Sequence, residues 1–287
     1  MKIAVVGLGL IGGSFCRAIK KKTSHICYGW NRSREVIRAA LAEEAIDGEI
    51  RDLSQLRDFD LVILGFHPEL TIRFAQEHID CFPKHGLTID TCGVKKSIVD
   101  VLQPLFDEAG APFIGVHPMA GREFSGFAYS LASLYEGASF IMTPSETANP
   151  EHIRLLSEFA REVGFTRIVN TDPETHDATI AYTSQVAHVL SNAYVKSPTL
   201  KNESGFSAGS FKDLSRVARL NADMWTELFM MNRDALVFEV ETLAKNLLSY
   251  SEALRNGDRE RLHSLLKEGS DLKEWATARD AGQKMDL

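Results

Sequence analysis

The 287-residue sequence predicts an α/β domain with a doubly wound, mostly parallel sheet, followed by an all-α domain. Three observations predict this arrangement. A glycine-spaced turn follows an apolar run at the N-terminus, apolar strands then alternate with amphipathic helices, and no convincing strand follows residue 170. Alternation of this kind is typical of parallel sheets, whose strands are joined by helical crossovers. We therefore expect one domain over residues 1–170 and another over residues 171–287.

The N-terminal apolar run leads directly into the turn GLGLIGGS of residues 7–14. In this strand–turn–helix context the first glycine permits the tight turn, the second lets the backbone approach a pyrophosphate, and the third lets helix and strand pack closely. The helix N-terminus directs free N–H groups toward the phosphates. The sequence therefore predicts a Rossmann-like dinucleotide site, whose expected residues are Gly7, Gly9, Leu10, Ile11 and Gly12.

The end of the second predicted strand, residues 25–30, bears on the choice of cofactor. An NAD-binding protein usually places a carboxylate there, on the ribose 2′-hydroxyl. This sequence instead has Asn31, Arg32 and Ser33. An amide, a guanidinium and a hydroxyl can bind a 2′-phosphate that a carboxylate would repel, which favours NADP. NAD stays possible, since asparagine can also bond a ribose hydroxyl.

The remaining elements follow from hydrophobic periodicity. In the first domain we expect further strands at 60–65, 87–90, 112–116, 138–142 and 166–169, with helices at 33–41, 68–79, 95–106 and 150–164. In the second domain we expect helices at 174–196, 210–220, 223–255 and 258–275. Long apolar stripes on such helices commonly pack against a second copy, which predicts a homodimer through the helical domain.

Composition excludes several classes of protein. A net charge of −7 and a pI near 5.7 argue against a nucleic-acid partner, which would require concentrated Lys and Arg. The four cysteines show no metal-ligand spacing, so we expect no metal. No apolar stretch is long enough to cross a bilayer and the chain opens on a strand without a leader, so we expect a cytoplasmic protein.

Several polar residues occupy positions suited to chemistry. His117 follows a buried strand, at the edge of the sheet where a nicotinamide would lie, which suits a general base. Helical spacing places Ser184 and His188 on one face of a long helix. Asp213 and Arg216 are three residues apart, which fits either a surface ion pair or an arginine oriented to hold a substrate carboxylate.

Taken in order, the motifs resemble the prephenate and arogenate dehydrogenase family. They are GxGxxGGS at 7–14, DxxxVK at 90–95, HPMAG at 117–121, HD at 176–177, SxxxH at 184–188 and FKDxxR at 211–216. Members oxidatively decarboxylate a cyclohexadienol, prephenate or arogenate, in tyrosine biosynthesis, and reduce NAD or NADP. The resemblance covers the chain from the first strand to about residue 232.

The resemblance also implies roles for individual residues. His117 would bond the ring 4-hydroxyl and accept its proton as hydride leaves the same carbon. Arg216, braced by Asp213, would hold a substrate carboxylate. The substrate-binding residues implied are Arg216, Asp213, His188, Ser184, Glu123 and His176. Any feedback by tyrosine is expected to act at the active site, because no separate regulatory module follows the helical domain.

One departure concerns the residue two places before Lys95. Relatives often have serine there, which supports the catalytic histidine and the cofactor, whereas this chain has Gly93. Thr91, Cys92, a backbone N–H or a water would have to replace that hydrogen bond, or the histidine is held less firmly. Thr91 is also expected to contact the cofactor.

Two other functions compete with this one. A β-hydroxyacid or imine-type dehydrogenase shares the domain order, but such enzymes typically use a lysine on the interdomain helix, and residues 174–195 contain none. A non-catalytic NADP-sensing regulatory protein would not require His117, His188 and Arg216.

Overall fold

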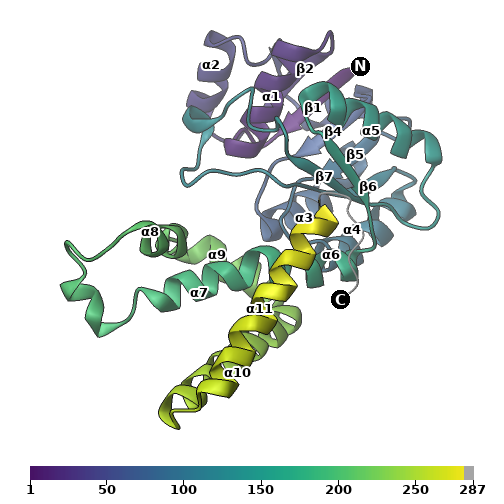
Figure 1. Ribbon diagram of the computed structural model, residues 1–287. Helices are drawn as coiled ribbons and strands as arrows, with labels where there is room; N and C mark the ends of the chain where they lie inside the picture. The colour runs from purple at the N-terminus through teal and green to yellow at the C-terminus, as the bar shows by residue number, and fades with distance from the viewer. Residues whose placement is uncertain (281–287) are drawn as a thin grey trace. The chain divides into compact units, whose positions relative to one another are not determined.

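The computed structural model describes residues 1–280 (Figure 1). The chain divides into two compact units, Met1–Ala235 and Leu236–Leu287. The first unit contains the sheet together with the first helices of the predicted all-α part, and the domain boundary expected at residue 170 stays a prediction. None of the described helices is long and apolar enough to span a membrane.

The sheet has eight strands in the order β3-β2-β1-β4-β5-β6-β7-β8. Neighbouring strands are parallel throughout, except that β7 runs antiparallel to β6. This confirms the predicted doubly wound, mostly parallel sheet. The strands are β1 (Lys2–Val6), β2 (Ile26–Trp30), β3 (Gly48–Glu49), β4 (Leu61–Leu64), β5 (Leu87–Asp90), β6 (Phe113–Pro118), β7 (Ser139–Thr143) and β8 (Arg167–Asn170).

Helices connect the strands and form most of the chain after β8. In the sheet region they are α1 (Leu10–Lys22), α2 (Arg34–Ala42), α3 (Pro68–Glu77), α4 (Lys96–Ala109) and α5 (Pro150–Val163). Short 3-10 turns occur at Leu53–Asp58, Ile79–Cys81, Phe127–Tyr129 and Pro198–Asn202. The later helices are α6 (Pro173–Ile180), α7 (Val186–Tyr194), α8 (Gly209–Ser215), α9 (Ala222–Met231), α10 (Arg233–Arg255) and α11 (Arg259–Asp280).

Two apolar cores cover the two faces of the sheet. Successive side chains of a strand point to opposite faces, and β1 accordingly contributes Ile3 and Val5 to one core and Ala4 and Val6 to the other. The first core also contains buried side chains of α1, α2 and α5, and the second contains those of α3 and α4. Figure 1 shows these helices on the sheet. Both faces are covered, as a parallel sheet requires.

The helical part differs from the sequence prediction in three places. A single helix was expected over 174–196, but a π-helical turn at Ala181–Gln185 separates α6 from α7. A single helix was expected over 223–255, but the chain turns at Asn232, between α9 and α10. The helix expected at 210–220 ends at residue 215. In the second unit, α10 and α11 are joined at Gly257, whose φ is +65°.

Candidate active site

The glycine turn between β1 and α1 has the geometry of a phosphate cradle. Gly7 has a φ of +98°, which favours glycine, and its N–H donates to Trp30 O over 2.8 Å. A Cβ on Gly12 would lie 2.0 Å from Gly7 O, so the helix can approach the strand only because residue 12 is glycine. A Cβ on Gly9 would meet nothing within 4 Å, which leaves open space where a pyrophosphate would lie.

The N-terminus of α1 is also suited to an anion. Gly9 is its N-cap residue, no side chain within the described residues caps it, and its first turn contains no acidic residue. Leu10 and Ile11 begin the helix, so their N–H groups belong to the turn that has no intrahelical acceptor. The described residues therefore fit a dinucleotide phosphate at this place.

The residues after β2 lie beside this cradle. The Leu8 N–H donates to Asn31 Oδ1 over 3.0 Å, which ties the end of β2 to the glycine turn. Arg32 and Ser33 are exposed. Ser33 is the N-cap residue of α2, as predicted, but its hydroxyl makes no capping hydrogen bond. The amide nitrogen of Asn31 and both neighbouring side chains therefore remain available to a ligand.

His117 lies near the end of β6, where the strand pairs with β7. Its Nδ1 is 2.9 Å from Nε2 of His176, and the other ring nitrogen of His176, Nδ1, is 2.7 Å from Asp177 Oδ1. The two rings meet edge to face, at 5.1 Å and 65°. The His176 side chain has no exposed surface. Three polar groups thus form a chain that runs from the sheet edge into α6.

Asp177 is anchored at the start of α4. The backbone N–H of Lys95 donates to Asp177 Oδ1 over 2.7 Å, and that of Lys96 donates to Oδ2 over 2.9 Å. Each N–H precedes or begins a helix, where a carboxylate is favoured by the helix dipole. The position of Asp177 is therefore determined by the α/β part of the unit.

A second anchor holds the backbone next to His117. Asp90 and Lys95 form a fully buried ion pair. The Lys95 ammonium also donates to Val116 O over 2.7 Å, and the Val116 N–H donates to Asp90 Oδ1 over 3.0 Å. A buried ion pair requires such additional hydrogen bonds to offset its desolvation. Both backbone groups of the residue preceding His117 are thereby fixed.

Gly93 faces the free side of the His117 ring. A Cβ on Gly93 would lie 3.7 Å from His117 Nε2 and 3.7 Å from Leu228 Cδ2, so a serine there would bring its hydroxyl to Nε2. The two neighbouring candidates do not replace it: Thr91 Oγ1 donates to Leu64 O over 3.0 Å, and the Cys92 thiol lies 3.7 Å from Phe66 O. Among the described residues the bond that holds His117 comes from His176 instead.

The surroundings of His117 keep its imidazole neutral. Burial is the largest cause that lowers the pKa of His117 well below 6.5, and electrostatic interactions with His176 and Lys95 lower it further. A neutral imidazole has a lone pair, so the ring can accept a proton near neutral pH.

The second predicted group gathers around His188 on α7. Its Nδ1 is 3.0 Å from Ser184 O, and its ring stacks on Trp225 of α9 with centroids 4.0 Å apart. Arg216 lies close enough to lower the pKa of His188, although burial is the larger cause. No ion pair joins Asp213 to Arg216 in the part of the chain that the structure describes, and both are exposed. The predicted bracing of Arg216 by Asp213 is therefore absent from this structure.

Two further predicted substrate residues, Glu123 and His176, differ in their surroundings. Glu123 is exposed on the loop that follows β6, and none of the hydrogen bonds or ion pairs between described residues involves its side chain. His176 was expected among the substrate-binding residues, but its buried ring contacts His117 and Asp177. The structure thus shows His176 in contact with His117 and Asp177, and its predicted contact with the substrate stays a prediction.

Two residues near the site escaped the sequence analysis. Asn232 Nδ2 donates to Asp177 O and to Gln185 Oε1, each over 2.8 Å, and thereby ties the chain before α10 to α6 and to the π-helical turn. Trp225 stacks on His188. A helix-breaking asparagine and a tryptophan on a helix suggest no role by themselves, because the partners that give them one are distant in the sequence.

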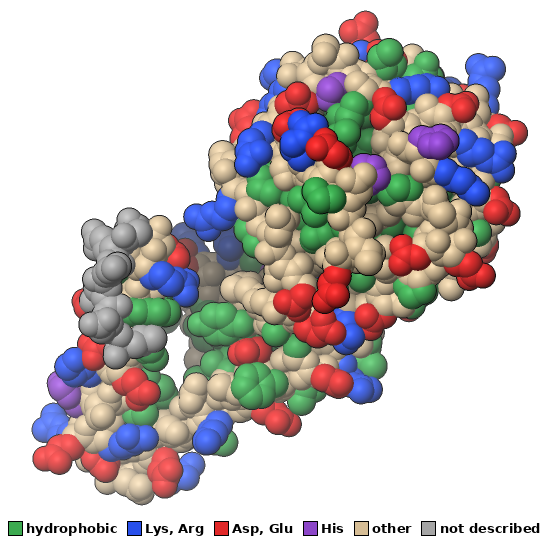
Figure 2. Space-filling model, turned by 90° about the vertical axis from the view of Figure 1, so that its right-hand side faces the viewer, with side chains coloured by type: hydrophobic (Ala, Val, Ile, Leu, Met, Phe, Trp, Pro, Cys, Tyr) green, Lys and Arg blue, Asp and Glu red, His purple; other side chains and the backbone are tan. Residues whose placement is uncertain are grey.

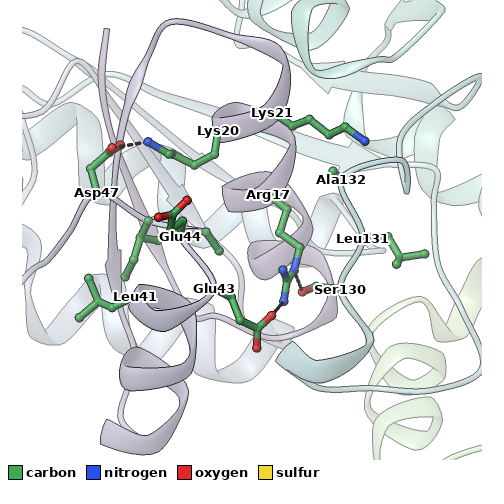
Figure 3. Close-up of a pocket in the computed structure, with 12 residues that line it drawn as sticks. Arg17, Lys20, Lys21, Leu41, Glu43, Glu44, Asp47, Ser130, Leu131 and Ala132 are labelled. Carbon is green, nitrogen blue, oxygen red and sulfur yellow. Dashed lines mark hydrogen bonds and ion pairs between the residues drawn. The ribbon is translucent and has the colours of Figure 1, made fainter.

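A surface pocket of about 830 Å³ lies along the outer side of α1 (Figure 3). Four of its charged side chains form pairs: Arg17 bonds Glu43 at 2.5 Å and also donates to Ser130 Oγ over 2.8 Å, and Lys20 pairs with Asp47. None of the residues that line it is a predicted site residue. We assign this pocket no part in the site.

Comparison with known proteins identifies the family. The model for the nucleotide-binding domain of prephenate dehydrogenase matches residues 15–169, and that for its dimerization domain matches residues 172–268. Prephenate dehydrogenase of Lactococcus lactis subsp. cremoris is 26% identical over 282 residues, which cover 95% of this chain and 77% of that protein.

Solved structures of relatives agree with this fold. Prephenate dehydrogenase of A. aeolicus, in complex with hydroxyphenyl propionate and NAD+, is 28% identical with a TM-score of 0.84, covering 96% of this chain and 98% of that one. Arogenate dehydrogenase of Synechocystis is 26% identical with a TM-score of 0.82, covering 96% and 100%. Because the two family models match nearly the whole described chain, the chain belongs to the prephenate dehydrogenase family of nicotinamide-dependent oxidoreductases.

Proposed function

We propose that this chain oxidatively decarboxylates prephenate or arogenate in tyrosine biosynthesis, with His117 as the general base. The observation that carries the role of His117 is the direction of its ring. Its Nδ1 is bonded to His176, while Nε2 has no hydrogen-bond partner among the described residues and lies 3.7 Å from the position that a Cβ on Gly93 would occupy. A base must present a free lone pair to the proton that it removes.

The reaction removes a hydride from the ring carbon and a proton from the hydroxyl on that carbon. The nicotinamide of a dinucleotide whose pyrophosphate binds at the glycine cradle would accept the hydride from the carbon that bears the hydroxyl. His117 Nε2 takes the hydroxyl proton as the carbon–oxygen double bond forms. The ring carboxylate then leaves as CO2, and the electrons of the broken carbon–carbon bond move through the ring to that oxygen. The oxygen regains the proton from His117 as the phenol forms. The forming aromatic ring is the electron sink, so decarboxylation needs no separate acid.

The substrate carboxylates are proposed to bind on the helical side. Arg216 and His188 lie near each other, and Trp225 presents an aromatic face beside them. A guanidinium can hold a carboxylate through two hydrogen bonds. Ser184, Asp213 and Glu123 stay as proposed contacts, with Glu123 on the exposed loop after β6 as a candidate for discriminating prephenate from arogenate.

An assay with both substrates and both cofactors tests the reaction. Purified protein is mixed with prephenate or arogenate and with NADP or NAD, and absorbance of the reduced nicotinamide is followed. We expect turnover with at least one substrate, and silence in all four mixtures would overturn the proposal. His117→Asn should lower kcat by about 10²–10⁴-fold, the usual contribution of a general base. An unchanged kcat would remove His117 from that role.

We further propose a preference for NADP, supported by the residues after β2. Asn31→Asp should shift the preference toward NAD, because the carboxylate can still accept from the Leu8 N–H but repels a 2′-phosphate. Arg32→Ala, at an exposed position, is the matched variant: it should weaken NADP and leave NAD unaffected. An unchanged ratio of kcat/KM values in the Asn31→Asp variant would mean that this segment does not select the cofactor.

A homodimer through the helical region is the last part of the proposal. It is supported by the match of residues 172–268 to a dimerization domain and by large hydrophobic side chains exposed on α10 and α11. Figure 2 shows hydrophobic side chains among charged ones on one face of the molecule. The cytoplasmic location expected from the sequence stays a proposal as well.

A further inference from the structure

We propose that His176 and Asp177 are positioning residues that fix the tautomer of His117, so that its Nε2 presents a lone pair to the substrate. The proposal rests on the proposed function, because it assigns how the base of that reaction is prepared. It reassigns His176, which the family resemblance placed on the substrate.

The direction of the hydrogen bonds follows from Asp177. Its carboxylate already accepts from the backbone N–H groups of Lys95 and Lys96, over 2.7 and 2.9 Å. An ionised carboxylate has no proton to donate, so the 2.7 Å contact with His176 Nδ1 is a bond in which the imidazole donates. The proton of a neutral His176 is therefore on Nδ1, and its Nε2 has a lone pair.

The next bond follows in the same way. His117 Nδ1, 2.9 Å from that lone pair, must donate to His176 Nε2. The proton of neutral His117 is then on Nδ1, and its Nε2 is the acceptor that faces Gly93. An isolated imidazole can place its proton on either nitrogen, and the bond made by one nitrogen determines the state of the other. A carboxylate that selects the tautomer of a catalytic histidine is a known device in other enzymes.

Burial makes this chain rigid. The His176 side chain has no exposed surface and that of Asp177 is 6% exposed, so water cannot compete for either bond. Asn232 Nδ2 also donates to the backbone O of Asp177, which fixes α6 from the other side. When His117 accepts a proton, the positive charge is separated from the Asp177 carboxylate by only one imidazole.

The absence of a serine at residue 93 gives this arrangement more importance. No side chain at Gly93 can orient His117 from the substrate side. Thr91 and Cys92 are bonded elsewhere. Among the described residues, the orientation of the ring then depends on the bond at Nδ1 and on the backbone anchor at Val116.

The tautomer can be measured directly by ¹⁵N NMR of the full-length protein labelled at histidine, with NADP bound and at a pH where His117 is neutral. The resonances of His117 are assigned by their loss in His117→Asn. We expect His117 to be protonated at Nδ1 in the wild type. A wild-type ring protonated at Nε2 would overturn the proposal, and this readout does not depend on turnover.

Two variants of His176 separate positioning from packing. His176→Leu removes the acceptor, and we expect the Nε2-protonated form of His117 to appear and kcat to fall by about 10²-fold with KM changed less than about threefold. His176→Gln places an amide oxygen near the position of Nε2, and we expect it to retain the Nδ1-protonated form and most of the lost kcat. NADP affinity, measured by fluorescence titration, checks that each variant is folded.

The outcomes distinguish this proposal from the proposed function. If the His176→Leu variant is folded and its His117 tautomer and kcat match the wild type, the positioning role is wrong. If the His176→Leu variant does not fold, the tautomers of the wild type and of the His176→Gln variant decide. If the wild type shows the expected tautomer but turns over neither prephenate nor arogenate, the proposed function fails while the hydrogen-bond chain stands.

Discussion

At the scale of single residues, the position of His117 could be predicted from the sequence, whereas the contacts that orient its ring could not. Its place near the end of a strand indicated a crevice residue, and the structure confirms that place. The partner that holds it, His176, is 59 residues away in the sequence. No local pattern encodes that contact, and the family resemblance assigned the partner to the substrate.

The pH dependence of activity should report the state of His117. Because its pKa is lowered below 6.5, the ring is neutral at pH 6.5 and above and loses its lone pair only as the pH falls through that lower value. The plot of kcat/KM against pH should therefore decline on the acid side with an apparent pKa below 6.5. A decline at or above 6.5 would contradict this assignment. The decline attributable to the ring should vanish in His117→Asn.

At the scale of elements, hydrophobic periodicity predicted most strands and helices near their observed bounds. It missed β3, whose two residues are too short to show a period, and it did not reveal that β7 runs antiparallel. It also joined helices across Asn232 and across the π-helical turn. Both interruptions are held by tertiary hydrogen bonds of Asn232 and Gln185, which a one-dimensional pattern cannot contain.

Substitutions of the two cradle glycines, Gly9 and Gly12, should have different effects on cofactor binding and on folding. Gly9→Ala meets no atom within 4 Å, so the protein should fold normally but bind NADP at least about 10-fold more weakly, because the methyl group occupies the pyrophosphate position. Gly12→Ala places its Cβ 2.0 Å from Gly7 O and should destabilise the fold itself. Thermal unfolding and fluorescence titration of both variants test this contrast. Equal effects of the two variants on Tm would refute it.

Asn232, at the turn between α9 and α10, should contribute measurably to the stability of the fold. Asn232→Ala removes two 2.8 Å hydrogen bonds and leaves Gln185 Oε1 without that donor. The free energy of unfolding should fall by about 1–3 kcal/mol, the cost of unpaired buried polar groups. Asn256→Ala, at an exposed position, serves as the control and should change it by less than about 0.5 kcal/mol. Urea denaturation measures both, and similar values would argue against the role of Asn232.

At the scale of the whole molecule, a single chain leaves several large apolar side chains of its helices exposed to solvent. Phe238 is 66% exposed, Leu248 68% and Leu254 65%. Scattered hydrophobic residues are normal on a surface, but a concentration of them on two helices favours an interface. The apolar stripes of the sequence led to the same expectation of an interface.

A single substitution that introduces a charge tests the oligomeric state. Leu248→Glu should shift the protein from dimer toward monomer in size-exclusion chromatography with light scattering, because a carboxylate in an apolar interface is costly to desolvate. Asn246→Glu, at an exposed polar position of the same helix, should leave the dimer intact. A wild-type monomer, or a Leu248→Glu variant that remains fully dimeric, would count against an interface on α10.

The π-helical turn at Ala181–Gln185 makes the length of this segment as important as its composition. The N–H of Val186 bonds Ala181 O, five residues back, so the turn contains one residue more than an α-helix would. Each residue rotates a helix by about 100°. Deleting a single residue here would restore a regular helix and rotate every later side chain, His188 included, away from its neighbours. Substitutions can be absorbed one at a time, whereas a change in chain length would alter the phase of the whole α7 helix.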